Sequence, residues 1–268
     1  MSQSLQRICC IYLRRQGDWA ACSLSRLERQ RSFSLVGNNE SKESTMQKFD
    51  TSTPVTAVLD VPASRVRFIA ADRSDTVVEV LPANASKSRD VTAAERTEVA
   101  YGDGVLRIKA PEAKNEVLGA SGSVEVTVQL PAGSRVEAKT SLAEFRGVGR
   151  LGDVSFESAQ GSVKLDETAS ARLALQSGDI SVGRLGGSAQ ISTQKGDLRI
   201  AEAMGGTVTL RTESGEISVG VARGVSASLD AGTSYGRIHN ALKNTDGADA
   251  ALTIHATTAY GDISARSL

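Results

Sequence analysis

Cysteines, aromatic residues, prolines and long apolar runs are scarce or absent over most of this 268-residue sequence. The three cysteines, Cys9, Cys10 and Cys22, all lie in the first 45 residues, so the rest of the chain offers no disulfide, thiol nucleophile or zinc-thiolate site. Basic and acidic residues both total 31, and this balance argues against a nucleic-acid binder that relies on attraction to phosphates. Aromatic residues make up only 4%, whereas glycine occurs 25 times, which is typical of short strands joined by tight turns.

No apolar run is long enough to cross a membrane. The run at residues 8–13 is shorter than the apolar region of a signal peptide, and Arg14 and Arg15 end it. The letters WAAC at residues 19–22 resemble a lipoprotein cleavage box, but RRQGD precedes them where an apolar segment is required. We therefore expect no membrane span and no export signal, and a cytoplasmic location.

The sequence divides into three parts. Residues 1–45 form an N-terminal extension that differs in composition from the rest, and Met46 opens the β-patterned sequence directly. Lys42 and Glu43 could be encoded by AAG GAG, a bacterial ribosome-binding sequence, so we hypothesise that translation begins at Met46. The alternative is a genuine disordered tail. We expect residues 46–142 to form an N-terminal β region that caps the fold, and residues 143–268 to form a repeat.

The repeat is built on a glycine that an acidic residue often follows. SGDISV at residues 177–182 returns as KGDLRI, SGEISV and YGDISA. Aligned on this glycine, seven units begin at Ala143, Gly161, Gly178, Gly196, Gly215, Gly236 and Gly261. Their spacing stays near 20 residues, which indicates a stacked repeat.

Apolar residues recur at fixed positions in every unit. Two residues after each start stand Phe145, Val163, Ile180, Leu198, Ile217, Ile238 and Ile263. Further apolar pairs precede each start, with a period of two that indicates strands buried on one side. We predict an all-β fold, a β-solenoid (β-helix-like) with about 18–20 residues per coil. The competing interpretation is a meander of hairpins.

Before the repeat, the predicted strands are longer. We expect them to form a wider sheet that caps the solenoid, because an open ladder edge invites aggregation. Residues 84–98 and 111–123 show no apolar alternation, and we expect both to be exposed loops.

An acidic residue follows the start of most units. The seven positions hold Glu144, Ser162, Asp179, Asp197, Glu216, Arg237 and Asp262. Stacking would line these side chains up along one corner, where they could either bind calcium or serve the turns. One acid per coil is poor chelation for an ion that takes six to eight oxygens, so turn chemistry is favoured.

A second series of side chains points outward from the strand after each start. It consists of Arg146, Lys164, Ser181, Arg199, Ser218, His239 and Ser264. This basic and hydroxyl stripe could bind an anionic polymer or a partner strand, or could be an ordinary solvated face. The two histidines, His239 and His255, lie in different units, and no phosphate loop or nucleophile motif is present. We assign no catalytic, cofactor-binding or metal-binding residue.

The repeated SGDISV, GSAQISTQKGDLRI and GGTVTLRTESGEISV, with the opening FDTSTPVTAVLDVPASRVRFIAADRSDTVVEV, resemble the DUF4097 family of bacterial β-strand-repeat, adhesin-like proteins. The resemblance covers residues 46–268. It implies an all-β repeat fold and no established activity or site residues.

We therefore expect a non-catalytic scaffold whose solenoid face presents a long surface to a protein or polymer partner. The alternative is a carbohydrate-active β-helix enzyme or a polysaccharide-binding protein. A groove that gathers acids around Arg146, Lys164 or Arg199 would favour the enzyme.

Overall fold

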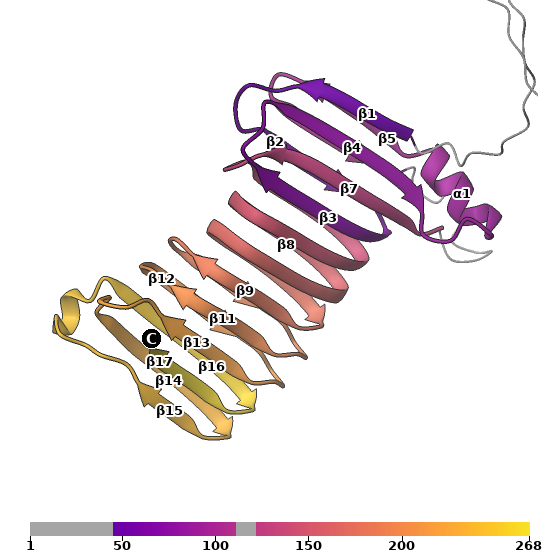
Figure 1. Cartoon of the computed structure of the whole chain (residues 1–268). Helices are drawn as coiled ribbons and strands as arrows, with labels where there is room; N and C mark the ends of the chain where they lie inside the picture. Colours follow the sequence, from indigo (N-terminus) through magenta and orange to yellow (C-terminus); the bar gives the residue numbers. More distant parts are fainter. Residues whose placement is uncertain (1–44, 111–121) are drawn as a thin grey trace, which may run out of the picture. The chain divides into compact units, whose positions relative to one another are not determined.

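Buried and half-exposed side chains alternate along the strands, as a period of two predicts. In β9 (Ile180–Leu185), Ile180 and Val182 are buried, and Ser181 between them is half-exposed. The computed structural model describes residues 45–110 and 122–268, which belong to one compact unit (Figure 1). The predictions for the first 44 residues, including the extension and its cysteines, lie outside the described residues, and the start at Met46 and the boundary between 142 and 143 stay predictions.

The strands wind as the coils of a solenoid with two faces. The first face holds β2 (Thr56–Asp60), β6 (Val105–Lys109), β10 (Ala189–Ser192), β12 (Gly206–Arg211), β14 (Ala227–Tyr235) and β16 (Leu252–Tyr260), of which the last four precede a glycine turn. The second face holds the strands that follow the turns, namely β3 (Ala63–Ala71), β7 (Val124–Pro131), β9, β11 (Leu198–Ala203), β13 (Ile217–Val221), β15 (Ile238–Ala241) and β17 (Ile263–Ser267). A long strand, β8 (Arg135–Ser177), turns at the corners and contributes successive passes to both faces.

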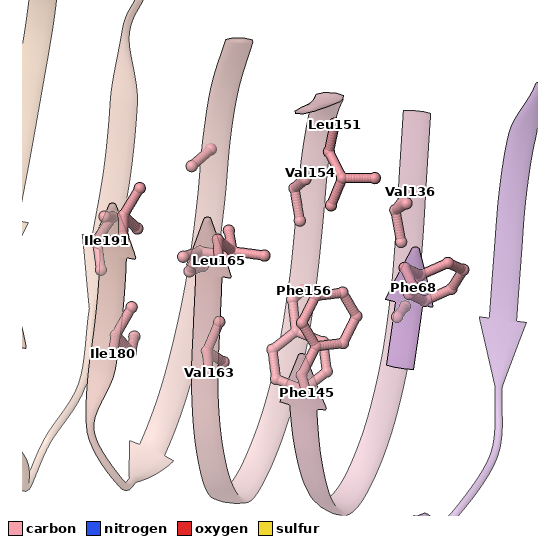
Figure 2. Close-up of a cluster of buried hydrophobic side chains, with 14 of the residues drawn as sticks. Phe68, Val136, Phe145, Leu151, Val154, Phe156, Val163, Leu165, Ile180 and Ile191 are labelled. Atoms are coloured by element: carbon pink, nitrogen blue, oxygen red, sulfur yellow. The ribbon is translucent and has the colours of Figure 1, made fainter. Parts of the chain in front are cut away.

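Neighbouring coils pair in parallel, and this confirms the solenoid over the hairpin meander. Ile180 of β9 is in register with Val163 on one side and Leu198 on the other, and Leu198 in turn is in register with Ile217. The predicted apolar column is therefore a continuous ladder inside the solenoid. Figure 2 shows part of the interior, where the ring centroid of Phe145 lies 5.6 Å from that of Phe68 and 4.7 Å from that of Phe156.

The glycine at each turn is required by the closeness of the next coil. Gly178 has a φ of 138°, and a Cβ atom built on it would lie 1.5 Å from the carbonyl oxygen of Gly161. Any side chain at this position would have to displace the backbone of the neighbouring coil.

At the N-terminal end the ladder becomes antiparallel and wider, as expected for a cap. β4 (Asp75–Pro82) joins β7 on the second face, and β1 (Thr45–Asp50) adds to β4. β5 (Glu98–Gly102) adds to β6 on the first face. Phe49 of β1 and Tyr101 of β5 meet across this end with their ring centroids 5.3 Å apart.

The coils do not stack in chain order at either end. β2 and β3 lie between the β6–β7 coil and the start of β8. At the other end, β16 and β17 pair with β12 and β13 on one side and with β14 and β15 on the other. The last coil of the chain is thus internal, and the β14–β15 coil forms the end.

Two sequence predictions are wrong. Residues 84–98 are not a plain loop, because they contain the helix α1 (Ser88–Glu95). This helix buries Asp90 and Ala94, and an oxygen of Asp90 accepts a hydrogen bond from the N–H of Ser123 at 3.0 Å. Ile238 is stacked on Ile263, but it is 45% exposed because the described residues place no coil beyond it. Of the second predicted loop, residues 111–121 lie outside the described residues.

The remaining elements are short. A 3-10 helix, η2 (Gly247–Asp249), lies in the connection between β15 and β16. Within the described ranges, no helix has the length and apolar content needed to cross a membrane. A cytoplasmic location stays a prediction.

Candidate functional site

The aspartates predicted at the turns, Asp179, Asp197 and Asp262, serve the backbone of a neighbouring coil. The N–H of Asp197 donates a hydrogen bond to Oδ1 of Asp179 at 2.9 Å, and the N–H of Glu216 donates to Oδ1 of Asp197 at 2.8 Å. These bonds satisfy N–H groups that turn geometry leaves without a ladder partner. In the part of the chain that the structure describes, no group of three or more His, Cys, Asp or Glu side chains could hold a metal ion.

The same arrangement recurs at the terminal coil with an added charge. The N–H of Arg237 donates to Oδ1 of Asp262 at 2.8 Å, and its guanidinium lies 3.3 Å from Oδ2. The backbone N–H of Arg237, followed by its positive charge, lowers the pKa of the Asp262 carboxyl. Arg237, which occupies a position that is acidic in most units, therefore pairs with the acid of the adjacent coil.

A series of threonines beside the glycines was not singled out from the sequence. The hydroxyls of Thr193, Thr212 and Thr258 donate to the carbonyl oxygens of Gly178, Gly196 and Gly215 at 3.2–3.3 Å. The signal was present, because each threonine stands three residues before a repeat glycine. These hydroxyls satisfy carbonyl groups at the corner, so their role is structural.

The basic and hydroxyl stripe does form one outward column on the second face. Ladder pairing sets Lys164, Ser181, Arg199, Ser218, Ser264 and His239 side by side in that order. Arg146 lies further along, where it forms an ion pair with Asp166 at 3.0 Å. Arg146, Lys164 and Arg199 line neither of the two hollows of about 500 and 270 Å³ in the described residues.

The two histidines lie on different faces. His239 is exposed on β15, opposite Ser264 of β17. His255, on β16, places Nδ1 3.2 Å from Oδ2 of Asp230 on β14. This pair is exposed on the first face, and no hydrogen bond joins it to a serine or threonine hydroxyl in the described residues.

The first face carries a groove that the sequence did not reveal. It encloses about 500 Å³ and crosses five passes of the chain. It is lined by Arg135, Asp153, Val154, Ser155, Ser170, Ala171, Arg172, Ser188, Ala189, Gln190 and Thr207. Because neighbouring strands lie about 4.8 Å apart, the groove extends for about 19 Å along the stacking direction.

Five of the eleven residues that line the groove are neutral and polar, and three are charged. They come from the outward positions that alternate with the apolar ladder of the first face. Ser170 donates a hydrogen bond to Oδ1 of Asp153 at 2.6 Å, and Arg135 lies 3.9 Å from the same carboxylate. In the sequence, a hydroxyl residue stands eight positions before the glycine in each of three successive repeat units, namely Ser170, Ser188 and Thr207.

The model of the Toastrack family DUF4097 matches residues 20–267. The chain belongs to the DUF4097 family. The match confirms the resemblance seen in the repeat, and it extends to residues before Met46. A comparison with curated proteins finds no match.

Several solved structures are similar to this DUF4097 chain at low identity. A "putative adhesin" from Bacteroides fragilis NCTC 9343 is 13% identical with a TM-score of 0.41, over 84% of this chain and 98% of that one. A "putative lipid binding protein" from Parabacteroides distasonis ATCC 8503 is 12% identical with a TM-score of 0.46, over 82% and 96%. A "putative cell adhesion protein" from Clostridium sporogenes ATCC 15579 is 13% identical with a TM-score of 0.36, over 84% and 100%.

Proposed function

We propose that this protein is a non-catalytic binding module that holds an extended macromolecular partner along the groove of its first face. The observation that supports this proposal is the direction of the groove, which crosses five passes of the chain. Its length of about 19 Å matches about six residues of an extended peptide at about 3.3 Å per residue. A compact small molecule would use only part of such a surface.

The lining favours a partner rich in hydrogen-bond acceptors. Arg172 lies on the middle of the five passes, between the pass that carries Ser155 and the pass that carries Gln190, and its side chain is exposed. No ion pair joins Arg172 to another described residue. Its guanidinium can therefore donate to carbonyl or carboxylate oxygens of a partner without first breaking an internal pair.

A polysaccharide is the second candidate partner, because hydroxyl and amide groups recur along the groove. Ser155, Ser170, Ser188, Gln190 and Thr207 can all exchange hydrogen bonds with sugar hydroxyls. The lining contains one carboxylate, Asp153, whereas glycoside hydrolysis generally uses two. Among carbohydrate functions, this favours binding over cleavage.

The test compares two charge reversals on opposite faces. The full chain and its Arg172→Glu and Arg199→Glu variants are immobilised and exposed to host extract, and bound proteins are quantified by mass spectrometry. Neutral and anionic polysaccharides are tested separately. Arg199 is the matched control, because it is an exposed arginine in the outward column of the second face.

We expect Arg172→Glu to weaken binding at least about tenfold, as loss of a charge-assisted contact predicts. Arg199→Glu should leave binding unchanged. Equal binding by all three proteins would contradict the proposal, and loss with Arg199→Glu alone would assign the partner to the second face.

A further inference from the structure

The C-terminal end of the solenoid is open in the described structure. β14 pairs only with β16 and β15 only with β17, so each has one edge without a described strand (Figure 1). At the N-terminal end, β1 and β5 also have one described partner strand each, but Phe49 and Tyr101 contact each other there and pack against the core. An unpaired strand edge presents N–H and C=O groups that can pair with another chain.

The apolar interior is also open at this end. Ile238 stacks on Ile263 and Leu229 stacks on Ile254, so both continue the internal ladders. Ile254 and Ile263 are fully buried, whereas Ile238 is 45% exposed and Leu229 is half-buried. The end thus combines two free strand edges with an uncovered core layer.

We propose that two copies of this chain associate end to end through the β14–β15 coil, related by a two-fold axis. A single incoming strand can pair with β14 or with β15, but not with both. The same end of a second copy presents two strands at the same spacing. It can therefore continue both ladders at once and cover the exposed core layer of each copy. A two-fold axis in the plane of the end makes both pairings antiparallel.

Charge selects between the two ways of forming this dimer. Asp230, which lies 3.2 Å from His255, is on β14, whereas Lys243 follows β15, and both side chains are exposed. One axis pairs β14 with β15 of the partner, so that acidic and basic side chains meet along this strand pairing. The alternative axis sets each strand against its own copy and places like charges together, which is unfavourable.

The first test is the oligomeric state of the full chain, measured by sedimentation velocity over a concentration series. We expect a reversible monomer–dimer equilibrium. Ile238→Lys should raise the dissociation constant at least about tenfold, because it places an ammonium group in the covered core layer. Met204→Lys is the matched control, since Met204 is also 45% exposed but lies at a turn away from this end, and it should dimerise as the wild type does.

The second test needs no variant. Hydrogen exchange of the wild-type chain is compared at low and high concentration, and amides of residues 227–241 should gain protection with concentration while those of β1 and β5 do not. A monomer at all concentrations, or protection of β14 and β15 that is independent of concentration, would overturn the proposal. Larger species that also protect β1 and β5 would indicate head-to-tail stacking and would overturn the two-fold arrangement.

Discussion

Glycine and aspartate at each turn have different roles. Gly178 allows two coils to approach until no Cβ atom fits, whereas Asp179 accepts a hydrogen bond from the N–H of Asp197. The first role cannot be transferred to another residue. The second needs only a side-chain oxygen, which asparagine also supplies.

Gly178→Val should therefore reduce the free energy of unfolding by at least about 1 kcal/mol more than Asp179→Asn, because it adds a side chain against the Gly161 carbonyl in a conformation that favours glycine. Urea denaturation of the two variants measures the difference. Equal losses would mean that the charge of Asp179 matters beyond its hydrogen bond, and would reopen the question of a ligand.

At the scale of elements, a cluster of ion pairs joins β1 to β4 within the N-terminal cap. Asp75, at the start of β4, lies 2.6 Å from Nε of Arg73 and 3.0 Å from Nζ of Lys48 on β1. Arg73 also donates to Gln129 of β7. Hydrogen bonds from Arg73 and then from Lys48 lower the pKa of Asp75 from 3.8 to about 2.

The depressed pKa predicts how stability depends on pH. Since the carboxyl of Asp75 binds its proton more weakly in the folded chain, its contribution is present above about pH 4 and is lost as the pH falls through about 2. Asp75→Asn should lower stability near neutral pH and flatten the decline between about pH 4 and 2. Urea denaturation at several pH values tests this, with Asp50→Asn, an exposed acid at the paired position of β1, as the control. Identical pH profiles for wild type and Asp75→Asn would contradict it.

The order of coils makes a separate prediction. Because β16 and β17 lie between two coils, deletion of residues 252–268 should leave β14 and β15 without a ladder partner. Hydrogen exchange should then become fast in residues 227–241, while β10 and β11 stay protected. Deletion of Leu268 alone should change neither region. Unchanged protection of residues 227–241 after the long deletion would show that β14 and β15 stack in chain order.

The sequence predicted the seven repeat coils but not which coil ends the stack. The register of Ile180, Leu198 and Ile217 followed from their spacing to glycine, because every coil meets the same steric demand. In the last two coils the apolar pair precedes the glycine by the same number of residues. The apolar pattern therefore did not indicate which of the two lies at the end of the stack. A polar residue, Asn240, stands where the four preceding coils carry Leu165, Val182, Ile200 and Val219, and it marks the coil that faces solvent.

The helix and the groove were missed for different physical reasons. α1 is short and uses Asp90 rather than an apolar stripe to attach itself, so its sequence looks like a loop. The groove depends on how outward side chains from five passes lie next to one another. Single positions such as Ser170 or Ser188 carry no sign of this until the coils are stacked.

For the whole molecule, the solenoid combines a side surface for a partner with an open end for a second copy. Each dimer would carry two grooves, and a polymer that reaches both would be held more tightly than by one. The two surfaces share no residue, so each can be altered without the other. The claim that decides the function is that one partner runs the length of the groove.

The measurement that tests this claim most directly is the affinity of the captured partner for Arg135→Glu and Thr207→Glu, which alter the two ends of the groove. These ends are about 19 Å apart. An extended partner contacts both, so each substitution should weaken binding at least several-fold, while Arg199→Glu on the second face should have no effect. Weakening by only one of the two end substitutions, or by neither, would contradict a partner that lies along the groove.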